Sequence, residues 1–268
     1  MQVERHAFYE PTEIERAVRE QVARVREVDF LSFVPNGEPT LDINLGREIA
    51  LLRPLDVKIA VITNGSLIWR EDVRADLMQA DWVSLKVDAV QEPAWCRINR
   101  PHRALRLASI LDGMRRFAQE YRGELATDTM LIAGVNDDAG HLEEIAGFLA
   151  CLRPAVACLA VPIRPPAERW VRSPDEATIN RAYQVFSSGL ERVELLTGYE
   201  GDAYAFTGDV EANLLSITAV QPMRQDAVNA FLARAGADWA VVHRLIAQGE
   251  LVETEYAGHK FYVRRPFR

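Results

Sequence analysis

Residues 29–40 read DFLSFVPNGEPT, and the rest of the chain is organised around them. The apolar run Asp29–Val34, rich in aromatic and branched residues, predicts a buried strand that a Pro-Asn-Gly turn ends. Glu38 then stands at the carboxyl end of that strand, where parallel α/β folds place ligand contacts. We expect Thr40 to cap a helix beginning at Leu41. The alternative is a turn with a solvated glutamate, and spacing alone leaves both open.

Strands and helices alternate along the next part of the chain. Further strands are predicted over residues 58–63, 82–88, 125–133, 156–161 and 193–196. Helices are predicted over residues 11–28, 45–52, 70–80, 104–121 and 138–152. A further helix is predicted after Ser173, which we expect to be its N-cap. This order indicates βα units, a parallel sheet and right-handed crossovers. It favours a full or partial barrel, and the absence of a G-x-G-x-x-G after any strand disfavours an open dinucleotide-binding sheet.

The third predicted strand carries the most information about a site. Ser84, Lys86 and Asp88 alternate with apolar residues, so they share one face of the strand. Either this face lines a polar ligand cavity, which we favour, or the strand lies at the edge of the sheet with this face exposed to solvent. Asn64, at the end of the second strand, and Asp128, inside the fourth, fit the same cavity.

From about Glu211 the alternation stops, which predicts domains over residues 1–207 and 212–268. Helices over residues 214–220, 226–234 and 239–248, followed by strands over residues 251–256 and 260–264, are the layout of a winged helix. Arg244, Lys260, Arg264, Arg265 and Arg268 make this end more basic than the rest of the chain. They suggest contact with RNA or another polyanion. Acidic residues on the wing favour the alternative, a protein-docking or lid module.

The composition sets outer limits on function. The chain has 268 residues, of which 49% are hydrophobic, and a net charge of −8, which argues against nucleic acid binding over the whole surface. No apolar run is long enough for a membrane span, and the N-terminus has no secretory signal. The chain has three cysteines, an odd number that argues against a framework of disulfide bonds. This fits a reducing compartment, so a cytoplasmic location is expected.

Six segments occur in a characteristic order: FVPNGEPTL (33–41), AVITNGSL (60–67), VSLKVDA (83–89), INRPH (98–102), MLIAGVND (130–137) and RPPAERW (164–170). Together they resemble the radical S-adenosylmethionine superfamily, in particular the wyosine-type tRNA-modifying synthases and their uncharacterised bacterial relatives. The resemblance covers nearly the whole chain. It implies an α/β fold, a partial (β/α)6 barrel, here lacking its first strand and followed by a small winged-helix-like domain.

The resemblance also implies roles for single residues. The glycine-glutamate-proline motif, Asn36, Gly37, Glu38 and Pro39, corresponds to the segment that contacts the amino group of S-adenosylmethionine. Thr63 and Asn64 end the next strand near the cofactor. Ser84, Lys86 and Asp88 match the region that meets the ribose hydroxyls and the methionine carboxylate. Asn99, Arg100 and His102 either face the substrate or form an ordinary polar loop.

One departure from the family is serious. The family binds a [4Fe-4S] cluster through a CxxxCxxC loop, and no such motif occurs among Cys96, Cys151 and Cys158. Without thiolates the cluster is not held, so we expect the chain to be inactive alone. We interpret it as an N-terminally truncated form of a longer gene product.

Three hypotheses follow. In the first, a complete form receives electrons from a reductant protein, cleaves S-adenosylmethionine to a 5′-deoxyadenosyl radical and abstracts hydrogen from an unknown substrate. In the second, the chain is a cluster-free binding or regulatory protein, which keeps the cofactor pocket but carries out no radical chemistry. The third, an aldolase-type barrel with Lys86 as Schiff-base residue, is disfavoured because Lys86 is more simply a partner for a carboxylate.

Overall fold

A computed structural model describes residues 2–25, 28–34, 37–198 and 208–265. These residues form two compact units, which are described separately. The first comprises residues 1–161 and 172–196, and the second comprises residues 162–171 and 197–268.

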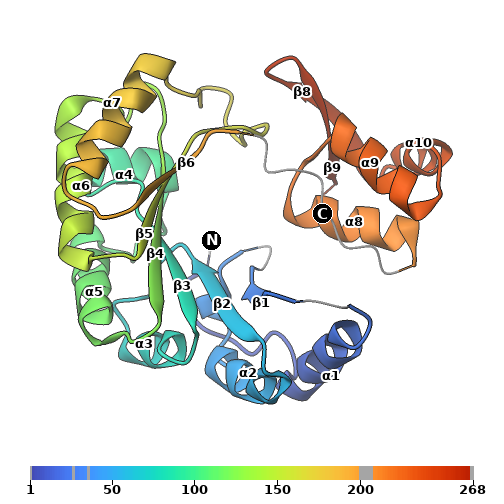
Figure 1. The fold of residues 1–268 in the computed structure, drawn as a ribbon, viewed down its shortest axis with the longest axis horizontal. Helices are drawn as coiled ribbons and strands as arrows, with labels where there is room; N and C mark the ends of the chain where they lie inside the picture. Colours follow the sequence, from blue (N-terminus) through green and yellow to red (C-terminus); the bar gives the residue numbers. More distant parts are fainter. Residues whose placement is uncertain (1, 26–27, 35–36, 199–207, 266–268) are drawn as a thin grey trace. The chain divides into compact units, whose positions relative to one another are not determined.

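The first unit is built on a parallel sheet of six strands in chain order (Figure 1). The strands are β1 (Phe30–Phe33), β2 (Lys58–Thr63), β3 (Trp82–Lys86), β4 (Glu124–Met130), β5 (Val156–Ala160) and β6 (Val193–Leu196). Every neighbouring pair is parallel. Because each strand lies next to its predecessor and the crossovers share one hand, the connecting helices gather on one face and the sheet curls towards a barrel. The predicted α/β fold is confirmed.

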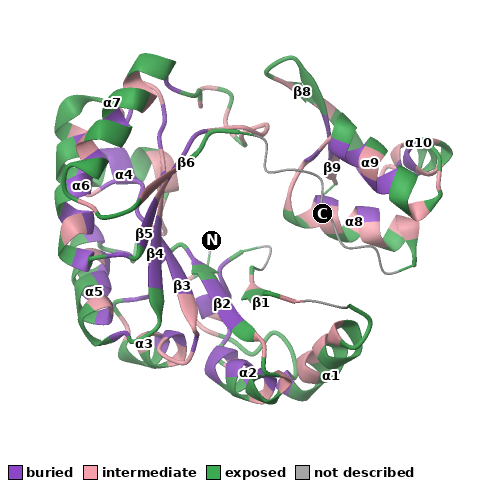
Figure 2. Ribbon diagram, in the orientation of Figure 1, coloured by how far each residue is buried: buried purple, intermediate pink, exposed green. Residues whose placement is uncertain are grey.

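The helices of this unit cover the convex face of the curved sheet (Figure 1). They are α1 (Pro11–Val22), α2 (Leu45–Leu52), α3 (Glu71–Leu77), α4 (Glu92–Asn99), α5 (Leu107–Glu120), α6 (Ala139–Leu152) and α7 (Glu176–Ser187). The four central strands are largely buried and the helices keep exposed outer surfaces (Figure 2). The edge strands β1 and β6 have only exposed and half-buried residues, so the prediction that the first strand is buried was wrong. Ile59, Val61, Val83 and Leu85 are fully buried on one face, while Ile62 on the other is 43% exposed. Alternation along the strands therefore separates an apolar face under the helices from a concave face open to ligands.

The segment before α1 is held to the turn after β1. His6 pairs with Asp42 in an isolated parallel bridge. The guanidinium of Arg5 donates to the carbonyl oxygens of Thr40 and Asp42 and forms ion pairs with Asp72 and Asp76 on α3. This anchors the N-terminal segment against the loop that carries Glu38.

Several local predictions were wrong. Thr40 does not cap a helix, because it lies inside a short 3-10 turn, Pro39–Leu41, that Glu38 caps. The helix after Ser173 is capped by Asp175, whose carboxylate accepts from the Thr178 amide at 2.8 Å. Helix α4 was not predicted, since its eight residues are too few for a clear apolar period.

The second unit combines helices with a small antiparallel sheet. Its elements are α8 (Val210–Val220), β7 (Met223–Arg224), α9 (Gln225–Ala235), α10 (Ala240–Ala247), β8 (Leu251–Tyr256) and β9 (His259–Arg264). The strand order is β7-β9-β8. Helix α8 begins four residues before the predicted start at Leu214, because Asp209 caps it through the Ala212 amide. The predicted hairpin turns at Ala257 and Gly258, both with positive φ, as a tight two-residue turn requires.

This unit has its own apolar core. Its fully buried members include Leu214, Met223, Val228, Phe231 and Leu245. The loop of residues 162–171 belongs to the same unit, and the Tyr256 hydroxyl donates to the Pro162 carbonyl at 3.1 Å. Its assignment as a winged helix stays a prediction, as do the domain boundaries at residues 207 and 212, the first of which lies outside the described residues. Over the described ranges, no helix has the length and apolarity needed to cross a bilayer.

Candidate functional site

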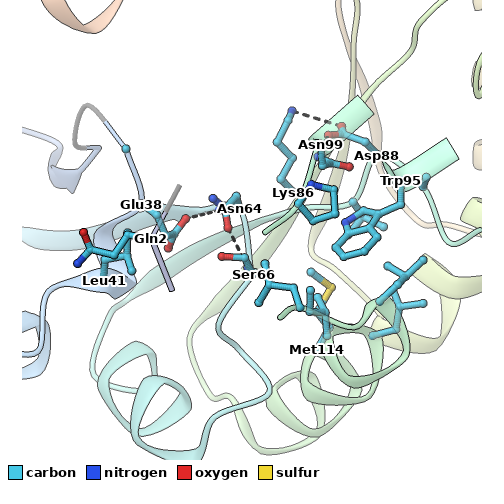
Figure 3. Close-up of a pocket in the computed structure, with 18 residues that line it drawn as sticks. Gln2, Glu38, Leu41, Asn64, Ser66, Lys86, Asp88, Trp95, Asn99 and Met114 are labelled. Atoms are coloured by element: carbon cyan, nitrogen blue, oxygen red, sulfur yellow. Dashed lines mark hydrogen bonds and ion pairs between the residues drawn. The ribbon is translucent and has the colours of Figure 1, made fainter. Parts of the chain in front are cut away.

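A cavity of about 300 Å³ opens at the carboxyl ends of β1, β2 and β3. Figure 3 shows the residues around it. Its polar lining comes from the N-terminal segment, from the end of β3, from the turns after the three strands and from the end of α4. It consists of Gln2, Glu38, Asn64, Ser66, Lys86, Asp88 and Asn99. Its apolar wall includes Trp95, Leu105, Ile110 and Met114. An apolar hollow with a few converging polar groups is the usual form of a small-molecule site.

Glu38 joins the ends of two strands. Its carboxylate accepts from the Thr40 amide at 3.1 Å, from the Thr40 hydroxyl at 2.6 Å and from the Thr63 hydroxyl. The other carboxylate oxygen accepts from the Asn64 amide at 2.8 Å. The acidic side chain therefore fastens the turn after β1 to the end of β2, and most of its acceptor capacity is used inside the protein.

Burial controls the charge of this carboxyl. Glu38 is 9% exposed. Burial raises the pKa of Glu38, while the hydrogen bonds from Thr40, Thr63 and Asn64 act in the opposite direction and favour the ionised form. The arrangement suits a positioning group better than a carboxylate offered directly to a ligand.

Lys86 stands between two acids on the concave face. Its Nζ lies 3.4 Å from Oδ1 of Asp88 and 3.5 Å from Oδ1 of Asp128. Although burial opposes its charge, the two carboxylates raise the pKa of Lys86. A Schiff-base lysine must be neutral to attack a carbonyl, so this environment disfavours the aldolase hypothesis.

A polar row crosses the sheet at the level of Lys86. Lys86 is in register with Asp128, Asp128 with Cys158, and Cys158 with Glu194. Because residues in register on parallel strands point to the same side, the row lies on one face. The polar concave face predicted from the third strand is thus extended through three more strands.

Asp88 and Asn136 join the loops after β3 and β4. The Asp88 carboxylate accepts from the Met130 amide and from the Asn99 side-chain amide, each at 2.9 Å. The Asn136 side-chain amide donates to the carbonyl oxygens of Asp88 and Met130, each at 2.8 Å, and its oxygen accepts from the Ile132 amide. The sequence interpretation did not single out Asn136, and the signal available was its place in the segment MLIAGVND, which follows a largely buried strand.

The structure brings together only part of the predicted site. Gly37, Glu38, Asn64, Lys86, Asp88 and Asn99 line the cavity. Thr63 and Ser84 are buried and do not line it, and Pro39 starts the 3-10 turn. Arg100 and His102 line a second, neighbouring cavity. Asn36 lies outside the described residues.

The cysteines do not fit an iron–sulfur cluster. Cys96 and Cys151 are exposed on α4 and α6, and Cys158 is half-buried in β5. Burial first, and then the nearby Asp128 and Glu194 carboxylates, raise the pKa of Cys158, which favours the thiol over the thiolate that binds iron. Among the residues that the structure describes, no group of three histidine, cysteine or acidic side chains could hold a metal ion.

Two of the basic residues predicted to contact a polyanion are paired with acids. Arg244 pairs with Glu211, and Lys260 pairs with Glu253 at 2.8 Å. Arg268 lies outside the described residues. Contact of this unit with RNA or protein stays a prediction.

Comparisons with known proteins agree with this geometry. The sequence profile described as the radical SAM superfamily, where SAM stands for S-adenosylmethionine, matches residues 2–149. A UPF0026 protein of Methanocaldococcus jannaschii is 40% identical over 98% of this chain and 83% of its own length.

Two solved structures have a similar fold. One is Streptococcus suis SuiB bound to S-adenosylmethionine, with a TM-score of 0.55 and 13% identity over 74% of this chain and 45% of that one. The other is TYW1 with a lysine–pyruvate adduct bound, with a TM-score of 0.52 and 16% identity over 70% of this chain and 66% of that one.

Proposed function

Because the chain belongs to the radical SAM superfamily, we propose that its barrel binds S-adenosylmethionine in the cavity at the carboxyl ends of β1 to β3. The observation that carries the proposal is the meeting of Glu38, Asn64, Lys86 and Asp88, from three successive strand ends, at one cavity. These residues are far apart in the sequence, and a shared ligand site accounts for their convergence at this edge of the sheet.

The charges of the cavity suit this cofactor. Glu38, Lys86 and Asp88 are its charged lining residues among those described, and with all three ionised they sum to −1. S-adenosylmethionine carries a sulfonium, an ammonium and a carboxylate, which sum to +1. In a partly buried site, opposite net charges attract more strongly than in water.

Each polar residue has a proposed task. The Lys86 ammonium pairs with the carboxylate of the cofactor. Asp88 keeps acceptor capacity for ribose hydroxyls in addition to its bonds from Met130 and Asn99. Glu38 positions the turn that carries Gly37, and this backbone rather than the carboxylate is proposed to meet the ammonium.

Reductive cleavage of the cofactor is the reaction of the family and needs an electron from a [4Fe-4S] cluster. The three cysteines of this chain do not fit such a cluster. We therefore expect the 268-residue chain by itself to bind the cofactor without cleaving it, and we assign radical chemistry and hydrogen abstraction only to a form that supplies three thiolates.

Isothermal titration of the chain tests the binding proposal. The ligands are S-adenosylmethionine and 5′-methylthioadenosine, which lacks the amino-acid part. Lys86→Met should weaken S-adenosylmethionine about tenfold or more, equivalent to ~1.4 kcal/mol, and methylthioadenosine less than about twofold. Lys58→Met, on the exposed start of β2, is the matched control and should change neither.

Lys86→Met leaves Asp88 and Asp128 without their cation, so the double variant Lys86→Met/Asp128→Asn guards against a simple folding failure. Thermal unfolding reports whether each variant is folded. A folded wild-type chain that does not bind S-adenosylmethionine, or a folded Lys86 variant that binds it as tightly as wild type, would overturn the proposal.

A further inference from the structure

A second cavity, of about 410 Å³, is lined by α4 and by the loop of residues 100–106 that follows it. Its basic lining residues are Arg100, His102, Arg103 and Arg106, and its acidic lining residue among those described is Glu92. We call it the arginine cavity. It shares Trp95, Pro101 and Leu105 with the first cavity, so the two hollows have a common wall.

The positive charge at this place is local. Residues 97–106 read RINRPHRALR, with four arginines and no acid, in a chain whose net charge is −8. A cluster of one sign against an opposite overall charge is not explained by solubility, which the net charge already provides. It points instead to an anionic group bound at this position.

The backbone presents these side chains around the cavity. Arg100 ends α4 in the left-handed region, with φ 45°, where glycine would be free of strain. The Arg106 guanidinium donates to the carbonyl oxygens of Arg103 and Leu105 at 2.9 and 3.1 Å, and the Ala104 amide donates to Nδ1 of His102 at 3.2 Å. These bonds order the loop, so the cost of fixing it around an anion is already reduced.

Helix α5 adds to the same potential. It is 14 residues long, begins directly after Arg106 and has no side-chain cap at its N-terminus. Its dipole therefore adds positive potential beside Arg106.

We propose that the arginine cavity binds the phosphate group of a small phosphorylated substrate whose reacting part enters the first cavity. Arginine forks match phosphate oxygens in geometry and charge. The inference rests on the proposed function, because it describes the substrate of that same site. A small ligand is favoured over RNA because the cations line one compact hollow, and a long polyanion would meet the negative remainder of the chain.

Isothermal titration with inorganic pyrophosphate, without S-adenosylmethionine, tests this inference. Failure of cofactor binding would leave this measurement unaffected, so the two proposals fail separately. We expect wild-type binding that weakens at least about fivefold in Arg103→Gln/Arg106→Gln and about threefold or more in Arg100→Gly. Arg153→Gly is the matched control, because Arg153 also ends a helix with positive φ but does not line the cavity. It should bind as wild type does.

Three results would overturn the inference. One is the absence of pyrophosphate binding by the folded wild-type chain, and another is equal loss in Arg100→Gly and Arg153→Gly. The third is a short single-stranded RNA that displaces pyrophosphate and loses its affinity in Arg103→Gln/Arg106→Gln, which would make the cavity part of a nucleic acid surface. Thermal unfolding of each variant shows that the comparison is made between folded proteins.

Discussion

The backbone amide of Asn64 donates to the carboxylate of Glu38 at 2.8 Å, which ties the end of β2 to the turn after β1. Glu38 also accepts from Thr40 and Thr63, so one buried side chain holds two strand ends in register. The resemblance implied that this motif contacts the cofactor. The structure shows that its side chain first organises the rim of the cavity.

Glu38→Gln should lower the free energy of unfolding by about 1–3 kcal/mol at pH 7, because an amide NH₂ would face donors that now bind a carboxylate. Urea unfolding measures the change. Glu143→Gln, at an exposed position of α6, is the matched control and should stay within about 0.5 kcal/mol of wild type. Equal effects of the two changes would contradict the anchoring role.

Asn136→Asp should destabilise the barrel by about 3 kcal/mol or more. Asn136 is fully buried, and the change replaces two donated hydrogen bonds, to Asp88 and Met130, with a carboxylate facing two carbonyl oxygens. The loss should shrink at low pH, where the new carboxyl is protonated and can donate. Asn44→Asp, at a partly exposed position, is the control, and chemical unfolding measures both variants. A similar loss of stability in Asn44→Asp would count against this explanation.

Glu48→Gln should change how stability depends on pH. Glu48 is 3% exposed and its Oε1 has no hydrogen-bond partner among the described residues. Burial, and then the Asp42 charge, raise the pKa of Glu48 from 4.5 to about 7. Between its unfolded pKa of 4.5 and its folded pKa of about 7, Glu48 keeps its proton in the folded state and loses it in the unfolded chain. The free energy of unfolding therefore falls as the pH rises through this range.

We expect Glu48→Gln to match wild type near pH 4 and to be more stable by about 1–3 kcal/mol at pH 8. Urea unfolding from pH 4 to 8 is the measurement, with Glu143→Gln again as the exposed control. Parallel pH profiles for wild type and Glu48→Gln would show that Glu48 does not titrate in this range.

Gly113→Ala should distort the wall of the first cavity. A Cβ at Gly113 on α5 would lie 2.7 Å from the Ile68 carbonyl oxygen and from the Trp69 backbone, in the loop after β2. The expected loss is about 1–3 kcal/mol or more, since backbone cannot move aside easily. Gly147→Ala on α6 is the matched change in open space and should stabilise by about 0.5–1 kcal/mol. Thermal unfolding should show lower stability for Gly113→Ala and higher stability for Gly147→Ala.

The sequence alone determined the layout of the barrel. The runs 58–63 and 193–196 match β2 and β6 residue for residue, because short β-branched and apolar runs between turn residues favour strands. It also located the polar groups at the strand ends, since parallel strands bring their carboxyl ends to one edge. The six motifs led to the family that the comparisons confirm.

The tertiary structure alone decided how those groups are used. Whether Glu38 faces a ligand or binds Thr63 depends on the path of a turn, and periodicity does not encode that path. Asn136 reaches Asp88 across 48 residues of sequence. Arg100 directly follows Asn99 but has left-handed backbone, and the two neighbours line different cavities. Short polar segments leave several backbone paths of similar energy, and only packing against the finished sheet selects one of them.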